Sequence, residues 1–86
     1  MSNALNKVTL IGYLGGDPEI RFTAHGAKVA RFSLATKEFW NSQEEKYEHT
    51  EWHKIVAWRN LAQIVEDYLS KGSRIFLEGR LRTKSW

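Results

Sequence analysis

Only one segment of this 86-residue chain has the hydrophobic spacing of an amphipathic helix. Its apolar residues recur at positions i, i+3, i+4, i+7 and i+8 and are Leu61, Ile64, Val65, Tyr68 and Leu69. Asn60 is placed to cap the start of this helix, and Gly72 is placed to end it with Lys71 beside the last carbonyl groups. A chain with a single short helix must build most of its core from strands.

The segments around the helix are rich in aliphatic and β-branched residues and are bounded by turn signals. We expect strands at residues 7–14, 27–39 and 49–58 and from Arg74 to the last residue, Trp86, with a short extended piece at 19–22. The polar residues 41–48 are expected to form a hairpin connection. Three strands, one helix and a further strand is the order of an OB-fold, an all-β Greek-key barrel with its helix between strands 3 and 4. We expect one such domain over residues 1–86, incomplete at its C-terminus because the fifth strand is missing.

Several classes of protein are excluded by simple features of the sequence. The chain has no cysteine, which excludes a disulfide scaffold, a thiolate metal site and a cysteine nucleophile. No apolar run approaches the ~20 residues of a membrane span, and the N-terminus lacks the pattern of a secretory signal. We therefore expect an intracellular domain.

Catalysis and metal binding also lack support in the sequence. His49 and His53 are four residues apart, as in a zinc-binding helix, but in a strand this spacing corresponds to about 13 Å, too far for one metal ion. Glu51 is in the wrong place for the zinc motif, and no nucleophile lies near a candidate base. We expect no enzyme activity, no metal and no cofactor.

The aromatic content is high for so small a core. Eleven aromatic residues, four of them tryptophan, make up 13% of the chain. An indole left in water forgoes a few kcal/mol of burial, so exposed tryptophans indicate a partner.

Strand alternation indicates which rings are exposed. On the 49–58 strand, one face carries Trp52, Lys54, Val56 and Trp58, and the other carries His53, Ile55 and Ala57. On the last strand, one face carries Phe76, Glu78, Arg80, Arg82, Lys84 and Trp86, and the other carries Ile75, Leu77, Gly79, Leu81 and Thr83. A core cannot hold so many unpaired cations, so the faces that mix rings and cations are predicted to point outward.

Rings interleaved with cations suit single-stranded nucleic acid. Bases stack on indoles, while lysine and arginine neutralise phosphates, and neither contact reads base sequence. The helix carries the acidic pair Glu66 and Asp67, which makes it a poor reader of a duplex groove.

Other interpretations of single rings stay open at this point. Trp58 is also consistent with a plug at the barrel mouth, Trp40 with a ring that pins the hairpin, and Trp86 with a disordered chain end. Phe76 suits either base stacking or packing against another subunit. At the level of the whole domain, an RNA-binding OB module or a replication-restart interaction domain is the alternative to DNA binding.

The chain resembles the bacterial-type single-stranded DNA-binding protein family. The resemblance covers nearly all 86 residues and is carried by the segments 6–15, 17–19, 30–36, 50–53, 61–73 and 78–86. It implies base stacking at Trp40, Trp52, Trp58 and Trp86. It implies phosphate contacts at Lys7, Arg21, Lys54, Lys71, Arg82 and Lys84. Position 58 is often phenylalanine in the family.

The resemblance also implies partners. Family members form homotetramers that dimerise through the first strand, here residues 7–14, and His53 matches a histidine associated with subunit contacts. They protect single-stranded DNA in replication, recombination and repair, in the bacterial cytoplasm and nucleoid. They recruit replication and repair proteins through an acidic C-terminal tail, which is absent from this sequence.

Overall fold

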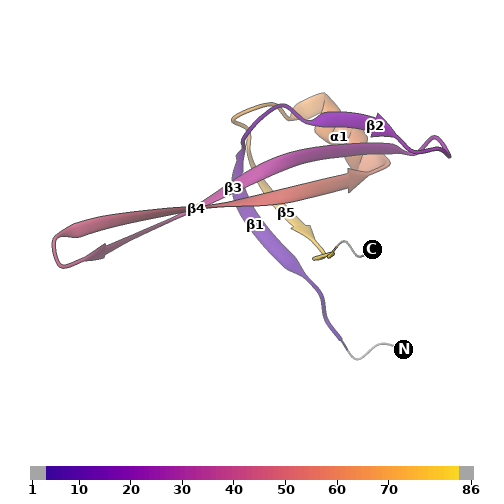
Figure 1. Ribbon diagram of the computed structural model, residues 1–86. Coiled ribbons are helices and arrows are strands. Elements are labelled where there is room, and N and C mark those ends of the chain that lie inside the picture. Colours follow the sequence, from indigo (N-terminus) through magenta and orange to yellow (C-terminus); the bar gives the residue numbers. More distant parts are fainter. Residues whose placement is uncertain (1–3, 84–86) are drawn as a thin grey trace.

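The computed structural model describes residues 4–83, which form one curled sheet with a helix at one end (Figure 1). The elements are β1 (Val8–Leu14), β2 (Glu19–Phe22), β3 (Lys28–Ser42), β4 (Glu45–Trp58), α1 (Asn60–Tyr68) and β5 (Arg74–Gly79). The strand order is β2-β3-β1-β5, with β4 paired to β3, and all pairs are antiparallel. The predicted order of strands and helix is confirmed, with the 19–22 piece as β2.

The core lies inside the curl of the sheet, beneath α1. Leu14, Ala30, Phe32 and Leu34 of β1 and β3 meet Ala62 and Val65 of the helix. Half-buried residues surround this cluster, among them Ile55 and Ala57 of β4 and Ile75 and Leu77 of β5. β1 holds the curl together, because it pairs with β5 along Val8–Tyr13 and with β3 at Tyr13 and Leu14.

The helix termini differ from the prediction. Asn60 is the first residue of α1 rather than its cap, and Arg59 stands at the N-cap position with φ 56° and no side-chain capping bond. The cause is that β4 continues to Trp58, and the Arg59 amide still donates to the Lys28 carbonyl, so the chain must turn within one residue. The helix ends at Tyr68, with Leu69 already extended. Gly72 (φ 88°) lies in the following turn, where the Lys71 amide donates to Asp17 instead of lying beside the helix carbonyls.

The predicted hairpin is present, but its connection is much shorter than the expected residues 41–48. β3 and β4 stay paired as far as Ser42 and Glu45, and only Gln43 and Glu44 form the turn, with φ 44° and 70°. Positive φ at both central residues matches the twist of a two-residue hairpin. The outer part of this hairpin extends away from the body (Figure 1). Residues 41–46 at its tip are polar on both faces, so they lack the alternation that marks a half-buried strand.

The last strand is shorter than predicted. β5 ends at Gly79, and Leu81 instead makes two hydrogen bonds to the side chain of Asn6, at 2.8 and 2.9 Å. Arg80 and Arg82 therefore lie in an irregular exposed segment, where strand alternation no longer assigns them a face. Lys84 and Trp86 lie outside the described residues. Over residues 4–83, no helix is long and apolar enough to cross a membrane.

Candidate nucleic-acid interface

The predicted alternation along β4 is confirmed. The side chains of Trp52 and Trp58 are 58% and 54% exposed, and Lys54 between them is exposed as well. His53, Ile55 and Ala57 are half-buried and point toward the core side. Six residues of strand separate the two indoles, which is about 20 Å.

The register of the sheet adds cations to this surface, because residues directly opposite on neighbouring strands share a face. Arg31 of β3 lies opposite Val56, and Ser33 lies opposite Lys54. Val29 of β3 lies between Trp58 on one side and Arg21 of β2 on the other. We call the surface formed by Trp52, Lys54, Val56, Trp58, Arg31 and Arg21 the aromatic–cationic face.

Small residues beneath Trp52 allow its ring to lie close to the sheet. The residue opposite Trp52 on β3 is the buried Ala35. A Cβ atom built on Gly15 would lie 2.5 Å from Cζ3 of Trp52, which means that the indole occupies the space a side chain there would need. The Gly15 amide is itself fixed by a bond to the Ser33 carbonyl. The position of this ring is therefore determined by the end of β1 as well as by β4.

Trp40 is on the other face of the β3–β4 ribbon. It lies opposite Tyr47, five residues along β3 from Ala35, and an odd separation places it on the opposite side from Trp52. Its ring stacks on Tyr47, with centroids 5.6 Å apart and planes 16° apart. The Tyr47 hydroxyl donates to Glu45, and this hydrogen bond raises the pKa of the phenol. The structure thus brings Trp52 and Trp58 together on one face but not Trp40.

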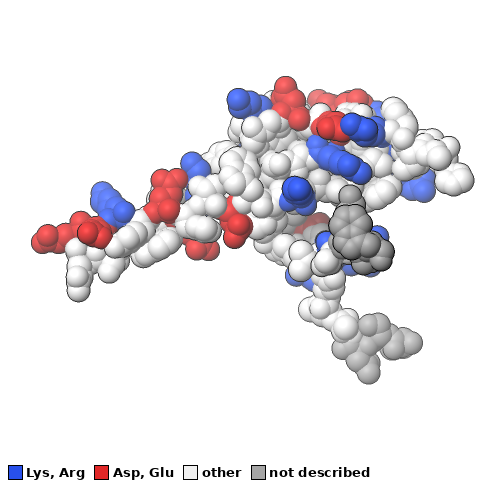
Figure 2. All heavy atoms as spheres, viewed as in Figure 1, with Lys and Arg blue, Asp and Glu red and all other residues white. Residues whose placement is uncertain are grey.

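The cations assigned to phosphates are spread over the molecule. Arg21, on the aromatic–cationic face, contacts Glu19, whereas Lys54 forms no ion pair within residues 4–83. Lys7 lies 3.6 Å from Glu78, at the far end of β1. Lys71 is exposed in the turn beside Asp17, and Arg82 is exposed beyond β5. In Figure 2, acidic and basic side chains are interspersed along the hairpin, and several basic side chains gather over the body.

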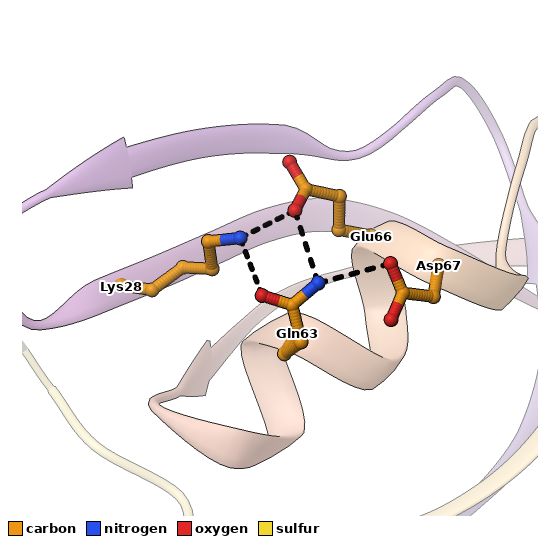
Figure 3. A network of polar contacts seen from close by, with 4 residues as sticks. All are labelled: Lys28, Gln63, Glu66 and Asp67. Atoms are coloured by element: carbon orange, nitrogen blue, oxygen red, sulfur yellow. Dashed lines mark hydrogen bonds and ion pairs between the residues drawn. The ribbon is translucent and has the colours of Figure 1, made fainter.

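The ammonium group of Lys28 is bound to side chains of α1 and is therefore less available to a ligand than the exposed cations. Lys28 donates to Gln63 at 2.7 Å and to Glu66, and Gln63 in turn donates to Asp67 at 2.9 Å (Figure 3). Its side chain is only 19% exposed. This network ties α1 to the start of β3.

The two residues assigned to subunit contacts lie on different surfaces. His53 points to the core side of β4, with its ring nitrogen 2.9 Å from the Thr36 hydroxyl. Phe76 is 61% exposed on β5, directly opposite the exposed Ile11 of β1. Together the two side chains form an apolar strip on the outer surface of the sheet.

Sequence reasoning did not single out Arg31 as part of the interface. Alternation places Arg31 on the same face of its strand as Val29, but only the register between β3 and β4 aligns that face with Trp52 and Trp58. The register of this hairpin is set by its two-residue turn at Gln43 and Glu44, whereas the sequence analysis expects a longer connection there. Within residues 4–83, no three histidine or acidic side chains lie close enough to hold a metal ion.

The chain is similar to known proteins in both sequence and structure. The sequence model of the single-strand binding protein family matches residues 5–86. Single-stranded DNA-binding protein 1 of Chlorobaculum tepidum is 55% identical over 87 residues, which cover 100% of this chain and 54% of that protein. The chain thus spans about half the length of this relative. Plasmodium falciparum SSB, solved as a complex with ssDNA, superposes with a TM-score of 0.90 at 42% identity, covering 100% of this chain and 78% of that one. This match confirms the OB-fold.

Proposed function

The chain belongs to the single-strand binding protein family, and on that premise we propose that it binds single-stranded DNA without reading its base sequence. The observation that carries the proposal is the pair of half-exposed indoles, Trp52 and Trp58, on one face with Lys54 between them. Family members are binding proteins. The P. falciparum relative was solved with single-stranded DNA bound.

Each group of side chains has a distinct part in this proposal. Unpaired bases stack on Trp52 and Trp58, and each stacked base contributes about 1–3 kcal/mol, because stacking removes the faces of both the indole and the base from water. Lys54, Arg21 and Arg31 neutralise phosphates and release counterions. Because every nucleotide offers a π-face and a phosphate, this mode of binding is independent of sequence.

The remaining assigned residues extend the bound strand beyond this face. The family resemblance supports stacking at Trp40 and Trp86 and phosphate contacts at Lys7, Lys71, Arg82 and Lys84. Trp40 contributes from the hairpin, where Tyr47 covers one side of its ring. The DNA must therefore pass from one face of the β3–β4 ribbon to the other to reach it.

We also propose that the protein assembles through its sheet. Phe76 and Ile11 form an exposed apolar strip that a second copy would remove from water. The family resemblance also assigns His53 to contacts between subunits. We expect the edge of β1 to pair with the first strand of a second copy, as in a homotetramer. In that form it protects single-stranded DNA during replication, recombination and repair in the bacterial cytoplasm.

A fluorescence titration tests DNA binding. Tryptophan emission is followed while oligo-dT is added at low salt, with a duplex of the same length as the control. Strong quenching by oligo-dT alone is expected. Absence of quenching at concentrations where gel-shift also detects no complex would refute the proposal, and clearly tighter binding of oligo-U would assign the protein to RNA instead.

Sedimentation tests the assembly. The wild-type chain is expected to sediment as an oligomer, and Phe76→Ser is expected to shift it toward smaller species because it removes apolar area from the strip. Leu61→Ser, at an equally exposed position of α1, is the control. A wild-type monomer at all concentrations would contradict this part of the proposal.

A further inference from the structure

An acidic side chain adjoins the cations of the aromatic–cationic face. Glu19 of β2 lies directly opposite Arg31 of β3, and residues directly opposite each other on neighbouring strands share a face of the sheet. Ile20 packs against the core, so its neighbours Glu19 and Arg21 point to the other side of the strand. Every other outward residue that the structure describes in the paired rows along residues 52–58 of β4 is apolar, neutral or basic. Glu19 therefore brings negative charge to a surface otherwise suited to a polyanion.

The carboxylate of Glu19 contacts one of these cations directly. It accepts a hydrogen bond from Nε of Arg21, two residues along the same strand. Both side chains are exposed, at 70% for Arg21 and 56% for Glu19. An ion pair this exposed contributes little to stability, because water solvates both charges when they separate. The backbone pairing of β2 with β3 holds the strand in place, so the carboxylate can exchange for another anion.

The other two cations of the aromatic–cationic face differ from Arg21. Within residues 4–83, neither Lys54 nor Arg31 forms an ion pair. Arg21 is thus the cation of this face whose charge the protein already balances. A phosphate that approaches Arg21 must either displace the Glu19 carboxylate or lie beside it. Both arrangements reduce the electrostatic gain that drives the binding of a polyanion.

We propose that Glu19 sets the affinity of the DNA-binding face, because its carboxylate competes with phosphate for Arg21 and so weakens the binding of single-stranded DNA. The inference rests on the proposed function and assigns to it a residue that acts against binding. In the free protein, the carboxylate occupies the guanidinium group. In the complex, a phosphate takes its place and Glu19 is left beside a polyanion. The bound strand therefore dissociates more readily than one held by the cations without this carboxylate.

The test compares Glu19→Gln with Glu44→Gln. Each substitution removes one negative charge at nearly constant side-chain size, so the two variants have the same net charge. Glu44 lies in the β3–β4 turn, at the opposite end of the molecule from β2 (Figure 1). Oligo-dT is titrated against both variants and the wild type at low salt, with tryptophan emission as the readout. Glu19→Gln is expected to bind about 2- to 5-fold more tightly than Glu44→Gln, the effect of releasing one exposed ion pair.

Salt dependence and a second background show whether the gain comes from Arg21. Without the carboxylate, Arg21 replaces solution counterions of the DNA more completely. The slope of log affinity against log salt is therefore expected to be steeper in Glu19→Gln by up to about 0.7, one phosphate contact. In a protein that already carries Arg21→Gln, the gain from Glu19→Gln is expected to fall to that of Glu44→Gln, because the cation that the carboxylate occupies is gone.

Glu19→Ala separates competition from positioning. Alanine leaves no acceptor for Arg21, so competition predicts tighter binding, whereas a carboxylate that orients the guanidinium group for phosphate predicts weaker binding. Weaker binding of Glu19→Ala would overturn the inference. An affinity of Glu19→Gln equal to or below that of Glu44→Gln would also overturn it, as would a gain that persists unchanged without Arg21. Failure of the wild type to bind any oligonucleotide would instead refute the proposed function itself.

Discussion

The indole of Trp52 lies directly on the backbone of Gly15, so that a methyl group at Gly15 would come within 2.5 Å of Cζ3 of the ring. The aromatic–cationic face is formed by residues of β2, β3 and β4. The Trp52 ring in this face lies against Gly15, which directly follows β1. The residue at position 15 therefore controls the position of the Trp52 ring. Gly16, one residue further on, has open space where a Cβ would be added.

We predict that Gly15→Ala weakens binding of oligo-dT while the protein stays folded. The added methyl displaces the tip of a side chain rather than backbone, so the indole rotates away and part of the ~1–3 kcal/mol of one stacked base is lost. Gly16→Ala is the matched control and should bind like the wild type. Equal affinity of the two variants would show that the position of Trp52 does not matter for binding.

Removal of the rings tests stacking directly. Trp52→Ala and Trp86→Ala are each expected to weaken binding by about 1–3 kcal/mol without unfolding the domain. Circular dichroism provides the control, since a lost strand signal in either variant would assign that ring to the core. For Trp52 the expectation is supported by its 58% exposure.

Cations that meet phosphate should differ in salt dependence from cations that hold the fold. Lys54→Ala is predicted to flatten the slope of log affinity against log salt by about 0.7, because one counterion fewer is released. Lys28→Ala should leave the slope unchanged, since Gln63 and Glu66 hold its ammonium group. The measurement is a titration series at increasing salt, and a flat response of the wild type would remove all cations from the interface.

The Lys28 network is predicted to contribute to stability instead. Lys28→Met should lower the free energy of unfolding by about 1 kcal/mol, the usual contribution of a partly buried hydrogen bond, because it releases Gln63 and Glu66. Urea denaturation measures this change. Lys46→Met, on the exposed hairpin, is the control and should unfold at the wild-type midpoint.

Much of the fold follows from local patterns in the sequence. The helix, the strands and the outward face of Trp52, Lys54 and Trp58 are set by period and alternation, and the structure agrees with them. The hairpin at 41–48 is expected from the sequence, but its connection is only the two residues Gln43 and Glu44, which lack the Asn-Gly signal that usually marks so short a turn. The separation of Trp40 from Trp52 was missed for a different reason, since it depends on how two long strands pair. Spacing along one strand cannot reveal that register.

The pH behaviour of Tyr47 tests the geometry of the hairpin around Trp40. Its hydroxyl donates to Glu45, and ionisation would lose that bond and place a phenolate beside a carboxylate, so the pKa of Tyr47 is raised above its usual value of about 10. A raised pKa means that the folded state holds the proton more tightly. The contribution of this group to stability is therefore complete below about pH 10 and is lost as the pH rises through the folded-state pKa. The signal of Tyr47 is the part of the near-ultraviolet tyrosinate absorbance that the wild type shows and Tyr47→Phe lacks. We predict that this signal has its midpoint above pH 10 in the wild type. In Glu45→Gln it should move down toward the ordinary value, and an unchanged midpoint would mean that the contact between Tyr47 and Glu45 does not form in solution.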